Sequence, residues 1–398
     1  MGLFFIVLVI FILFPILSSL LSFLLMFIDR HNSKKYLVLF CLSISLIVLS
    51  YIPSMSQDGY RIMSEINNWK SFSSMRGMFL TLSANHMEES SYPVFSLLMY
   101  LVSRTPYITY ISGISLCLTL LCSLYPIVDL YSKDKIGRFQ AIIGVVSILV
   151  WINYLLVVSG MRFYLATALV LLIAYENLFI RNNKLLSLLY FIPIFVHPGI
   201  IPVVIIAFLA NFKKSKNILV SVLMLALLPT VVYFATFFNN HINVYYLNLM
   251  FSKVTHYASN ENYTELMGRA FFIRLWMSMV VIILILIWYT FFLKNKSNKY
   301  YLFIQYTLLF TLGSAPFYNL GDRNINVAIP LVVMLVILEV MKKSNRTSRL
   351  IDVLIGMNSI VIVIIIGIFY NLNNIKYLTL SEPVTRIIFK SLMDVLQP

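Results

Sequence analysis

Long apolar runs separated by short basic clusters make up most of this 398-residue chain. A helix that crosses a bilayer needs about 20 apolar residues, so each such run predicts a transmembrane helix. The twelve runs are 3–28, 36–52, 107–130, 140–158, 163–180, 185–197, 199–211, 217–238, 270–293, 300–317, 325–341 and 350–371. The short pair on either side of "HPG" could instead form a helical hairpin that does not fully cross. We expect an all-α polytopic membrane protein of about twelve transmembrane helices (range 10–14), forming one integral membrane domain over residues 1–398.

The basic clusters predict which side of the membrane each connection occupies. They lie in alternate connections, as the positive-inside rule expects of the cytoplasmic side. Their members are Arg30, Lys34 and Lys35; Lys133, Lys135 and Arg138; Arg181 and Lys184; Lys213, Lys214 and Lys216; Lys294, Lys296 and Lys299; and Lys342, Lys343, Arg346 and Arg349. Both termini, the long loops 53–91 and 239–269 and the tail 372–398 then lie outside. The apolar segment 91–102 is too short to span comfortably, so we expect a re-entrant or surface helix there.

Composition agrees with a membrane protein and narrows the chemistry. Hydrophobic residues make up 60% of the chain and charged residues 11%, whereas soluble domains are about a quarter charged. The net charge of +15 resides largely in the loop clusters, so we do not expect nucleic acid as a partner. The three cysteines lie in apolar segments with no metal-ligand spacing, and the chain contains no phosphate-cradling or zinc-protease motif. We therefore expect neither a metal nor a cofactor.

Arginine is unusually common on the predicted outer side. The cytoplasmic clusters contain 13 Lys and 5 Arg, whereas the outer remainder contains 8 Arg and 4 Lys. Arginine differs from lysine in its planar fork of donors, which binds phosphate and carboxylate in a bidentate manner. Four outer arginines lie at helix ends and are candidates for binding an anionic ligand: Arg162, Arg323, Arg269 and Arg274. The alternative for each is a side chain that reaches lipid headgroups.

The first outer loop carries groups suited to carbohydrate. Asp58 and Tyr60 stand in "QDGY", Trp69 follows, and Glu88 and Glu89 precede the short apolar segment. Carboxylates can bind sugar hydroxyls, and aromatic faces can stack on sugar rings. Tyr60, Trp69, Glu88 and Glu89 are the candidate sugar-binding residues, and Asp58 supplies a further carboxylate beside them.

A histidine is expected at the same outer level. His197 stands in "FVHPG", and histidine is the side chain best suited to exchange a proton near neutral pH. It is a candidate catalytic residue, and a structural histidine at a proline-induced break is the alternative.

Several short motifs occur in the order seen in a known family. They are "QDGY", then "YPVFSLLMYLVSR", "SGMRFYLATALVLLIAYENLFIRNNK", "LLYFIPIFVHPGIIP" and "GDRNINVAIP". In these the chain resembles the EpsG-like, Wzy-type polysaccharide polymerases of bacterial envelopes. The "RX10G" pattern cited for some Wzy proteins is not met, because Ile173 stands where the glycine would be.

The resemblance implies a function, a location and a set of roles. It implies a metal-independent glycosyltransferase of GT-C-like fold in the bacterial inner membrane, active on the periplasmic face. Its donor and acceptor would be undecaprenyl-pyrophosphate-linked glycans, with membrane lipids and a chain-length regulator protein as further partners. Arg162 and Arg323 would clamp the pyrophosphate, and His197 or Asp58 would serve as base or orient the acceptor.

Two other functions fit a polytopic chain with outer arginines. A flippase or transporter for the same lipid-linked unit is the main alternative, although the chain shows no internal repeat and its charges gather at the outer edge. A membrane acyltransferase or another glycosyltransferase that modifies surface polysaccharide is the second.

Overall fold

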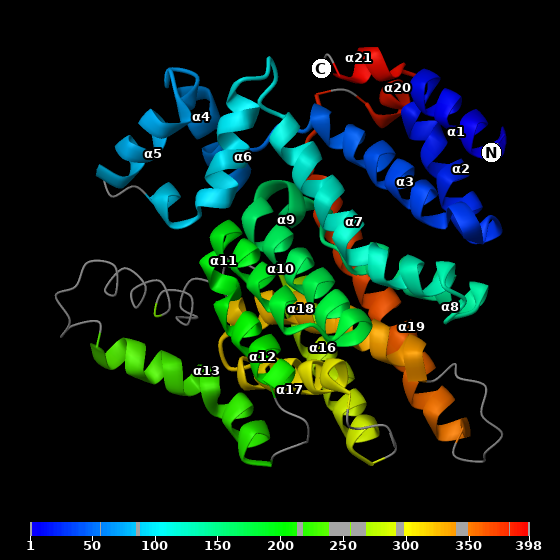
Figure 1. Cartoon of the computed structure of the whole chain (residues 1–398), viewed down its shortest axis with the longest axis vertical. Coiled ribbons are helices and arrows are strands. Elements are labelled where there is room, and N and C mark those ends of the chain that lie inside the picture. The colour runs from blue at the N-terminus through cyan, green and yellow to red at the C-terminus, as the bar shows by residue number, and fades with distance from the viewer. Residues whose placement is uncertain are drawn as a thin grey trace. The chain divides into compact units, whose positions relative to one another are not determined.

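The computed structural model describes residues 2–55, 57–84, 88–212, 218–238, 255, 268–291, 298–339, 349–381 and 383–396. Within these ranges the secondary structure is helical, and the one pairing of extended backbone is an isolated bridge between Tyr51 and Leu380 (Figure 1). The predicted all-α class is confirmed. The described residues form two compact units, and each is treated by itself below: 1–175, 183–204 and 374–398 in the first, and 176–182 and 205–373 in the second.

The first unit is built around four helices, α2, α3, α7 and α10, each of which packs against the next. Helix α3 contacts both α2 and α7, and α7 contacts α10. Around them lie shorter helices and the C-terminal segments. The helices are α1 (Gly2–Leu13), α2 (Pro15–Ile28), α3 (Ser33–Ile47), α4 (Asp58–Trp69), α5 (Met75–Ala84), η3 (Glu88–Ser91), α6 (Pro93–Ser103), α7 (Tyr110–Ser132), α8 (Arg138–Trp151), α9 (Tyr154–Ser159), α10 (Met161–Ala174), η5 (Lys184–Tyr190), α11 (Phe191–Val196), η6 (Pro198–Ile200), η7 (Ile375–Tyr377), α20 (Val384–Ile388) and α21 (Leu392–Leu396).

The second unit is a bundle of apolar helices. Helix α17 packs against α13, α16 and α18, and α16 also packs against α18. Their bounds are α13 (Ile218–Phe238), α16 (Arg269–Phe291), α17 (Lys299–Gly313), α18 (Tyr318–Glu339) and α19 (Arg349–Asn374). Helix α12 (Ile201–Phe212) and the π-helical turn η4 (Tyr175–Arg181) both extend across the boundary between the units.

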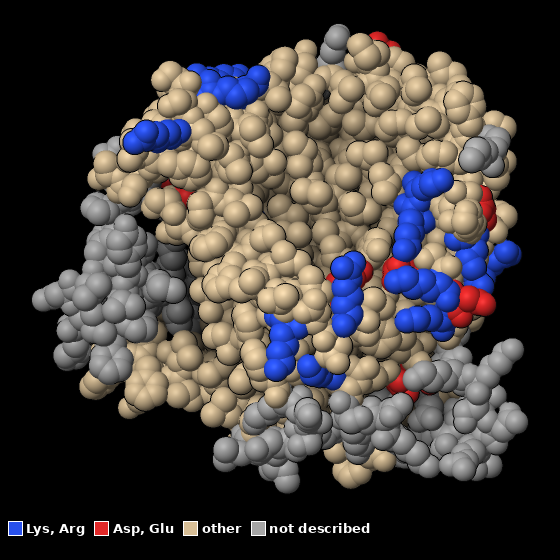
Figure 2. All heavy atoms as spheres, in the orientation of Figure 1, with Lys and Arg blue, Asp and Glu red and all other residues tan. Residues whose placement is uncertain are grey.

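Seven of the described helical segments are long and apolar enough to cross a membrane. They are Arg30–Ser50, Tyr110–Ser132, Met161–Arg181, Val220–Phe237, Arg269–Phe291, Tyr318–Glu339 and Val353–Tyr377. Each of the other predicted runs coincides with shorter helices. The membrane character of the protein is thus supported by several independent helices. Figure 2 shows that uncharged atoms cover most of the face in view, as expected of a surface that meets lipid.

Two runs predicted as single spans are each broken in two. Pro15 begins a new helix after Phe14, because proline lacks the amide hydrogen that a continuous helix needs and fits the first helical turn. Asn153 breaks the run 140–158, where its side chain caps α9 by accepting a hydrogen bond from the Leu156 amide at 3.2 Å. At these two places a proline or a polar residue ends one helix and begins another, although the apolar pattern alone predicts one continuous helix.

The structure describes most of the first predicted outer loop and very little of the second. Loop 53–91 folds into the helices α4 and α5, and the predicted short helix after it is confirmed as α6. Helix α4 is amphipathic and packs its apolar side against α6 and α9. Loop 239–269 lies almost wholly outside the described residues.

A buried carboxylate ties three helices together at the end of α7. Asp129, whose side chain is fully buried, accepts hydrogen bonds from Lys133 Nζ and from the Tyr175 hydroxyl, each at 2.7 Å. Lys34 at the start of α3 forms a second ion pair with it. Since these partners come from α3, α7 and the end of α10, the cluster fixes the spacing of the helices at that level.

Candidate functional site

Arg162 is a buried cation that other charged groups of the described chain do not satisfy directly. It is the second residue of α10, and only 8% of it is exposed. Its guanidinium carbon lies 4.3 Å from the centroid of the Tyr92 ring, a cation–π contact. Among the described residues, no hydrogen bond or ion pair engages its nitrogens. The forked donors that suit phosphate or carboxylate are thus available to a ligand.

Tyr92 connects this arginine to a buried carboxyl group. Its hydroxyl donates to Glu89 Oε1 at 3.0 Å, while its ring faces Arg162. Glu89 is only 5% exposed, and its main-chain oxygen accepts a second hydrogen bond from Ser96 Oγ at 2.8 Å. Tyr92 therefore contacts both the carboxyl group of Glu89 and the guanidinium group of Arg162, which comes from α10.

A second carboxyl group, that of Glu65, completes the cluster. Glu65 lies on α4, is hydrogen-bonded to Glu89, and has its Oε1 3.9 Å from Nε of Arg61 on the same helix. Burial and the adjacent Glu89 carboxyl raise the pKa of Glu65 to about 7. Arg61 and Arg162 oppose that rise in pKa through their positive charges. The Glu65 carboxyl group therefore takes up or releases its proton near neutral pH beside a buried arginine.

Close packing at Gly59 brings two of the predicted motifs together. A Cβ atom at Gly59 would lie 3.3 Å from the Cα of Ser159 and 3.4 Å from the Val158 carbonyl oxygen. The "QDGY" segment thus rests on the "SGMR" turn, just ahead of Arg162. Asp58 and Tyr60, on either side of the glycine, are both exposed.

His197 lies beside the residue that follows Arg162. Its ring meets the ring of Phe163 edge to face, with centroids 5.6 Å apart, and α11 packs against α10. Nδ1 of His197 accepts a hydrogen bond from the Gly199 amide at 3.0 Å. The proton of the neutral ring is then on Nε2, so in this geometry His197 offers a donor rather than a base.

The remaining predicted sugar-binding residues have different surroundings. Trp69 is buried, with 4% of its surface exposed, and it belongs to the packed side of α4. Its ring therefore presents no open face to a sugar, and the position is one of packing. The amphipathic period of α4 explains this, since Trp69 falls on the same side as Ile62 and Ile66. Glu88 begins η3, and its side chain lies outside the described part of the structure.

Arg274 in the second unit is satisfied within the protein. Its side chain is fully buried, with Nη1 donating to Asp322 Oδ1 at 3.1 Å and Nη2 donating to Asn326 Oδ1. Its guanidinium carbon also lies 4.3 Å from the Tyr370 ring centroid. These contacts engage Nη1, Nη2 and one face of the guanidinium group, so Arg274 connects α16, α18 and α19.

The other predicted arginines of the second unit are more accessible. Arg269 is exposed at the start of α16, and Arg323 is partly exposed next to Asp322 on α18. The predicted clamp combines Arg162 of the first unit with Arg323 of the second, and it stays a prediction.

Two members of the cluster, Glu65 and Tyr92, are not among the residues expected from the sequence. A usable signal exists for Glu65, because it stands four residues after Arg61 within an amphipathic segment of a membrane protein's loop. Tyr92 has a weaker signal, its place immediately before Pro93 at a helix start. Comparison of the chain with protein-family models, with curated proteins and with solved structures gives no match. The functional argument therefore depends on the chemistry of this cluster.

Proposed function

We propose that this protein is a glycosyltransferase that joins undecaprenyl-pyrophosphate-linked oligosaccharide repeat units on the periplasmic face of the bacterial inner membrane. Its product would be a surface polysaccharide, whether O-antigen, capsule or exopolysaccharide. One observation carries the proposal: a buried arginine with available donors, beside two carboxyl groups, at the start of an apolar helix.

The contrast between Arg162 and Arg274 supports a ligand at the first of them. Burying a charge without a partner is costly, and Arg274 meets that cost with an aspartate and an asparagine. Arg162 has an aromatic face and, at longer range, the Glu65 carboxyl group, whose pKa is raised to about 7. An anionic group bound at Arg162 would supply the missing partner, and a pyrophosphate is such a group.

The proposed reaction uses this arrangement directly. A hydroxyl of the acceptor attacks the anomeric carbon of the donor, the bond from that carbon to the pyrophosphate oxygen breaks, and the electron pair leaves with the lipid pyrophosphate. Fixed guanidinium donors at a site shielded from water stabilise the charge that develops on the leaving group. The donor is already activated, so the reaction needs no nucleotide at this site.

The wider arrangement belongs to the same proposal. We infer about twelve crossings of the membrane with both termini outside, so that α4, α5 and the head of α10 lie at the periplasmic face. Arg323 is a second candidate phosphate contact. A GT-C-like fold is the corresponding architectural proposal.

Deletion of the gene in its native host tests this function. We expect long-chain surface polysaccharide to disappear on gels while glycan carrying a single repeat unit is retained. Loss of all repeat-bearing glycan, with lipid-linked units accumulating on the inner leaflet, would assign the protein to transport instead. Unchanged long chains would reject both functions.

A further inference from the structure

The cluster at Arg162 contains two carboxyl groups that differ in access to solvent. The side chain of Glu65 is 21% exposed, whereas Glu89 is only 5% exposed and accepts a hydrogen bond from the Tyr92 hydroxyl. A residue that exchanges a proton with a substrate must be accessible to that substrate. A residue that only shifts the pKa of the first residue need not be. Glu65 meets the first requirement and Glu89 the second.

We propose that Glu65 is the base that accepts the proton of the acceptor hydroxyl, and that Glu89 positions and tunes Glu65. This inference depends on the function proposed above. In the step itself, the acceptor oxygen forms its bond to the anomeric carbon as its proton passes to the Glu65 carboxylate. The electron pair of the broken bond leaves with the pyrophosphate at Arg162, and Glu65 afterwards releases its proton to water.

The two bases suggested by sequence are less well arranged. His197 already uses Nδ1 to accept the Gly199 amide hydrogen, so the nitrogen that a base requires is occupied. Asp58 is an exposed residue at the first turn of α4. Glu65 differs from both because it shares a hydrogen bond with a second carboxyl group and feels the charge of Arg162.

The acidity of Glu65 suits this role. Its pKa of about 7 means that a large fraction is ionised at neutral pH, while the proton affinity of the carboxylate is higher than that of an ordinary glutamate. The charged groups that act on it are Glu89 from η3, Arg162 from α10 and Arg61 from its own helix. Tyr92, Tyr100 and Tyr154 also lie on or next to α6 and α9, the helices that pack against α4.

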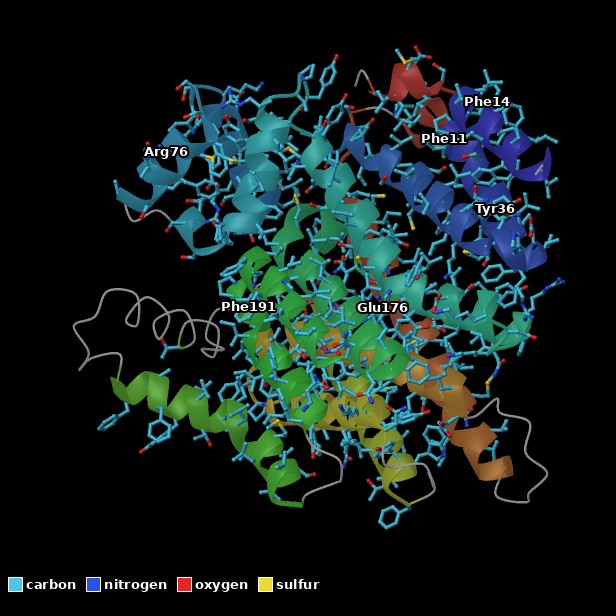
Figure 3. The ribbon with its side chains drawn as sticks, viewed as in Figure 1. Phe11, Phe14, Tyr36, Arg76, Glu176 and Phe191 are labelled. Carbon is cyan, nitrogen blue, oxygen red and sulfur yellow. The ribbon has the colours of Figure 1, made fainter. Side chains whose placement is uncertain are left out.

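The test uses the deletion strain complemented with variants of the full-length gene. Glu65→Gln should reduce chain extension by about 10²- to 10⁴-fold, the usual contribution of a general base. Glu65→Asp should recover part of it. The matched control is Glu176→Gln (Figure 3), because the Glu176 side chain is 24% exposed and pairs with Arg181 on its own helix at 3.2 Å. That control should extend chains normally, and immunoblots of membranes should show equal amounts of each variant.

A second measurement distinguishes a base from a residue needed only for folding. Membranes from each strain are given lipid-linked repeat units extracted from the deletion strain, and the extension rate is followed between about pH 5 and about pH 9. The wild-type rate should rise through a pH of about 7, where Glu65 ionises. Glu89→Gln removes the neighbouring carboxylate, so the rise should move about one unit toward lower pH.

The outcomes separate the two proposals. If the wild-type gene restores long chains and Glu65→Gln restores them equally well, Glu65 is not the base and the polymerase function stands. If Glu89→Gln leaves the pH profile unmoved, the tuning role is wrong. If the wild-type gene fails to restore long chains, the polymerase function fails, and the role of Glu65 fails with it.

Discussion

The guanidinium carbon of Arg162 lies 4.3 Å from the centre of the Tyr92 ring, at the start of a helix that is otherwise largely apolar. The ring supports the cation without using its hydrogen-bond donors, which a carboxylate partner would occupy. Tyr92 at the same time fixes Glu89 through its hydroxyl. One tyrosine thus holds two oppositely charged groups while leaving the arginine fork available.

Replacing Arg162 by lysine tests the need for that fork. Arg162→Lys keeps the positive charge but loses bidentate binding, so we expect about a 10- to 100-fold loss of long-chain polysaccharide, the equivalent of one charge-assisted hydrogen bond. Gel analysis of surface glycan measures the effect. Arg76→Lys is the control, because Arg76 is an exposed arginine on α5 (Figure 3). Undiminished chains in Arg162→Lys would rule out a phosphate-binding role for the fork.

Replacing Arg274 should affect the stability of the protein rather than its activity. Arg274→Gln leaves Asp322 buried without its cation, which typically costs about 3–5 kcal/mol. Thermal unfolding of the detergent-purified protein should show a markedly lower midpoint than in Arg162→Gln. Replacing both partners together, as in Arg274→Met with Asp322→Leu, should recover much of the loss. If the single variant unfolds like the wild type, the ion pair is not structural.

Stability should fall as the pH rises from about 5 to about 8, owing to Glu65. Its pKa in the folded protein, about 7, lies above the ordinary glutamate value, so the folded state binds the proton more tightly than the unfolded state. The Glu65 contribution is therefore most favourable at low pH and is lost as the pH approaches 7. Its size is at most about 3.5 kcal/mol, because the pKa rises from 4.5 to about 7 and each pH unit corresponds to about 1.4 kcal/mol.

Melting curves of the wild type and of Glu65→Gln across that pH interval measure this effect. Glutamine does not titrate, so the variant should show a flatter dependence and gain on the wild type at the alkaline end. Parallel curves for the two proteins would contradict the assignment.

Gly59→Ala should separate α4 from the turn before Arg162. The added carbon would lie 3.3 Å from the backbone Cα of Ser159, which cannot rotate away as a side chain can. We expect reduced polymer and a loss of about 1–3 kcal/mol in stability, as for other overpacked sites. Gly77→Ala is the matched control, because a Cβ atom there would meet the side-chain oxygen of Ser74 at 3.2 Å rather than backbone, and alanine favours the helix. Equal behaviour of the two variants would mean that the close packing at Gly59 has no functional consequence.

The apolar pattern predicts the helices of this protein well and the partners of its buried charges poorly. Helix positions follow from run length, and failures occur at single residues such as Pro15 and Asn153 that interrupt a run. Arg162 stands out in the sequence because one charge precedes a long apolar stretch. Arg274 has the same appearance, yet its partner Asp322 is 48 residues away along the chain. Only the packing of helices distinguishes a satisfied arginine from one with available donors.

The predicted first outer loop shows a second limit of prediction from the sequence. Trp69 looks like a sugar platform when aromatic content alone is considered, but the period of α4 assigns it to the packed side. Glu65 lies on that helix beside the buried positions, and its role depends on Glu89 from another segment. Neighbours that come from separate elements cannot be inferred from spacing along one of them.

The carboxylate Asp129 has a mechanical consequence for Arg162. Tyr175, which donates to Asp129, lies just past one end of α10, and Arg162 lies at the other, roughly 20 Å away at 1.5 Å per residue. The lysine ion pairs anchor that far end to α3 and α7. Helix α10 also packs against α7, α9 and α11, so it is braced by its neighbours as well as tied at that end. A bound anion would therefore meet a guanidinium group that is already in place, and the buried carboxylate at the far end of the helix helps to keep it there.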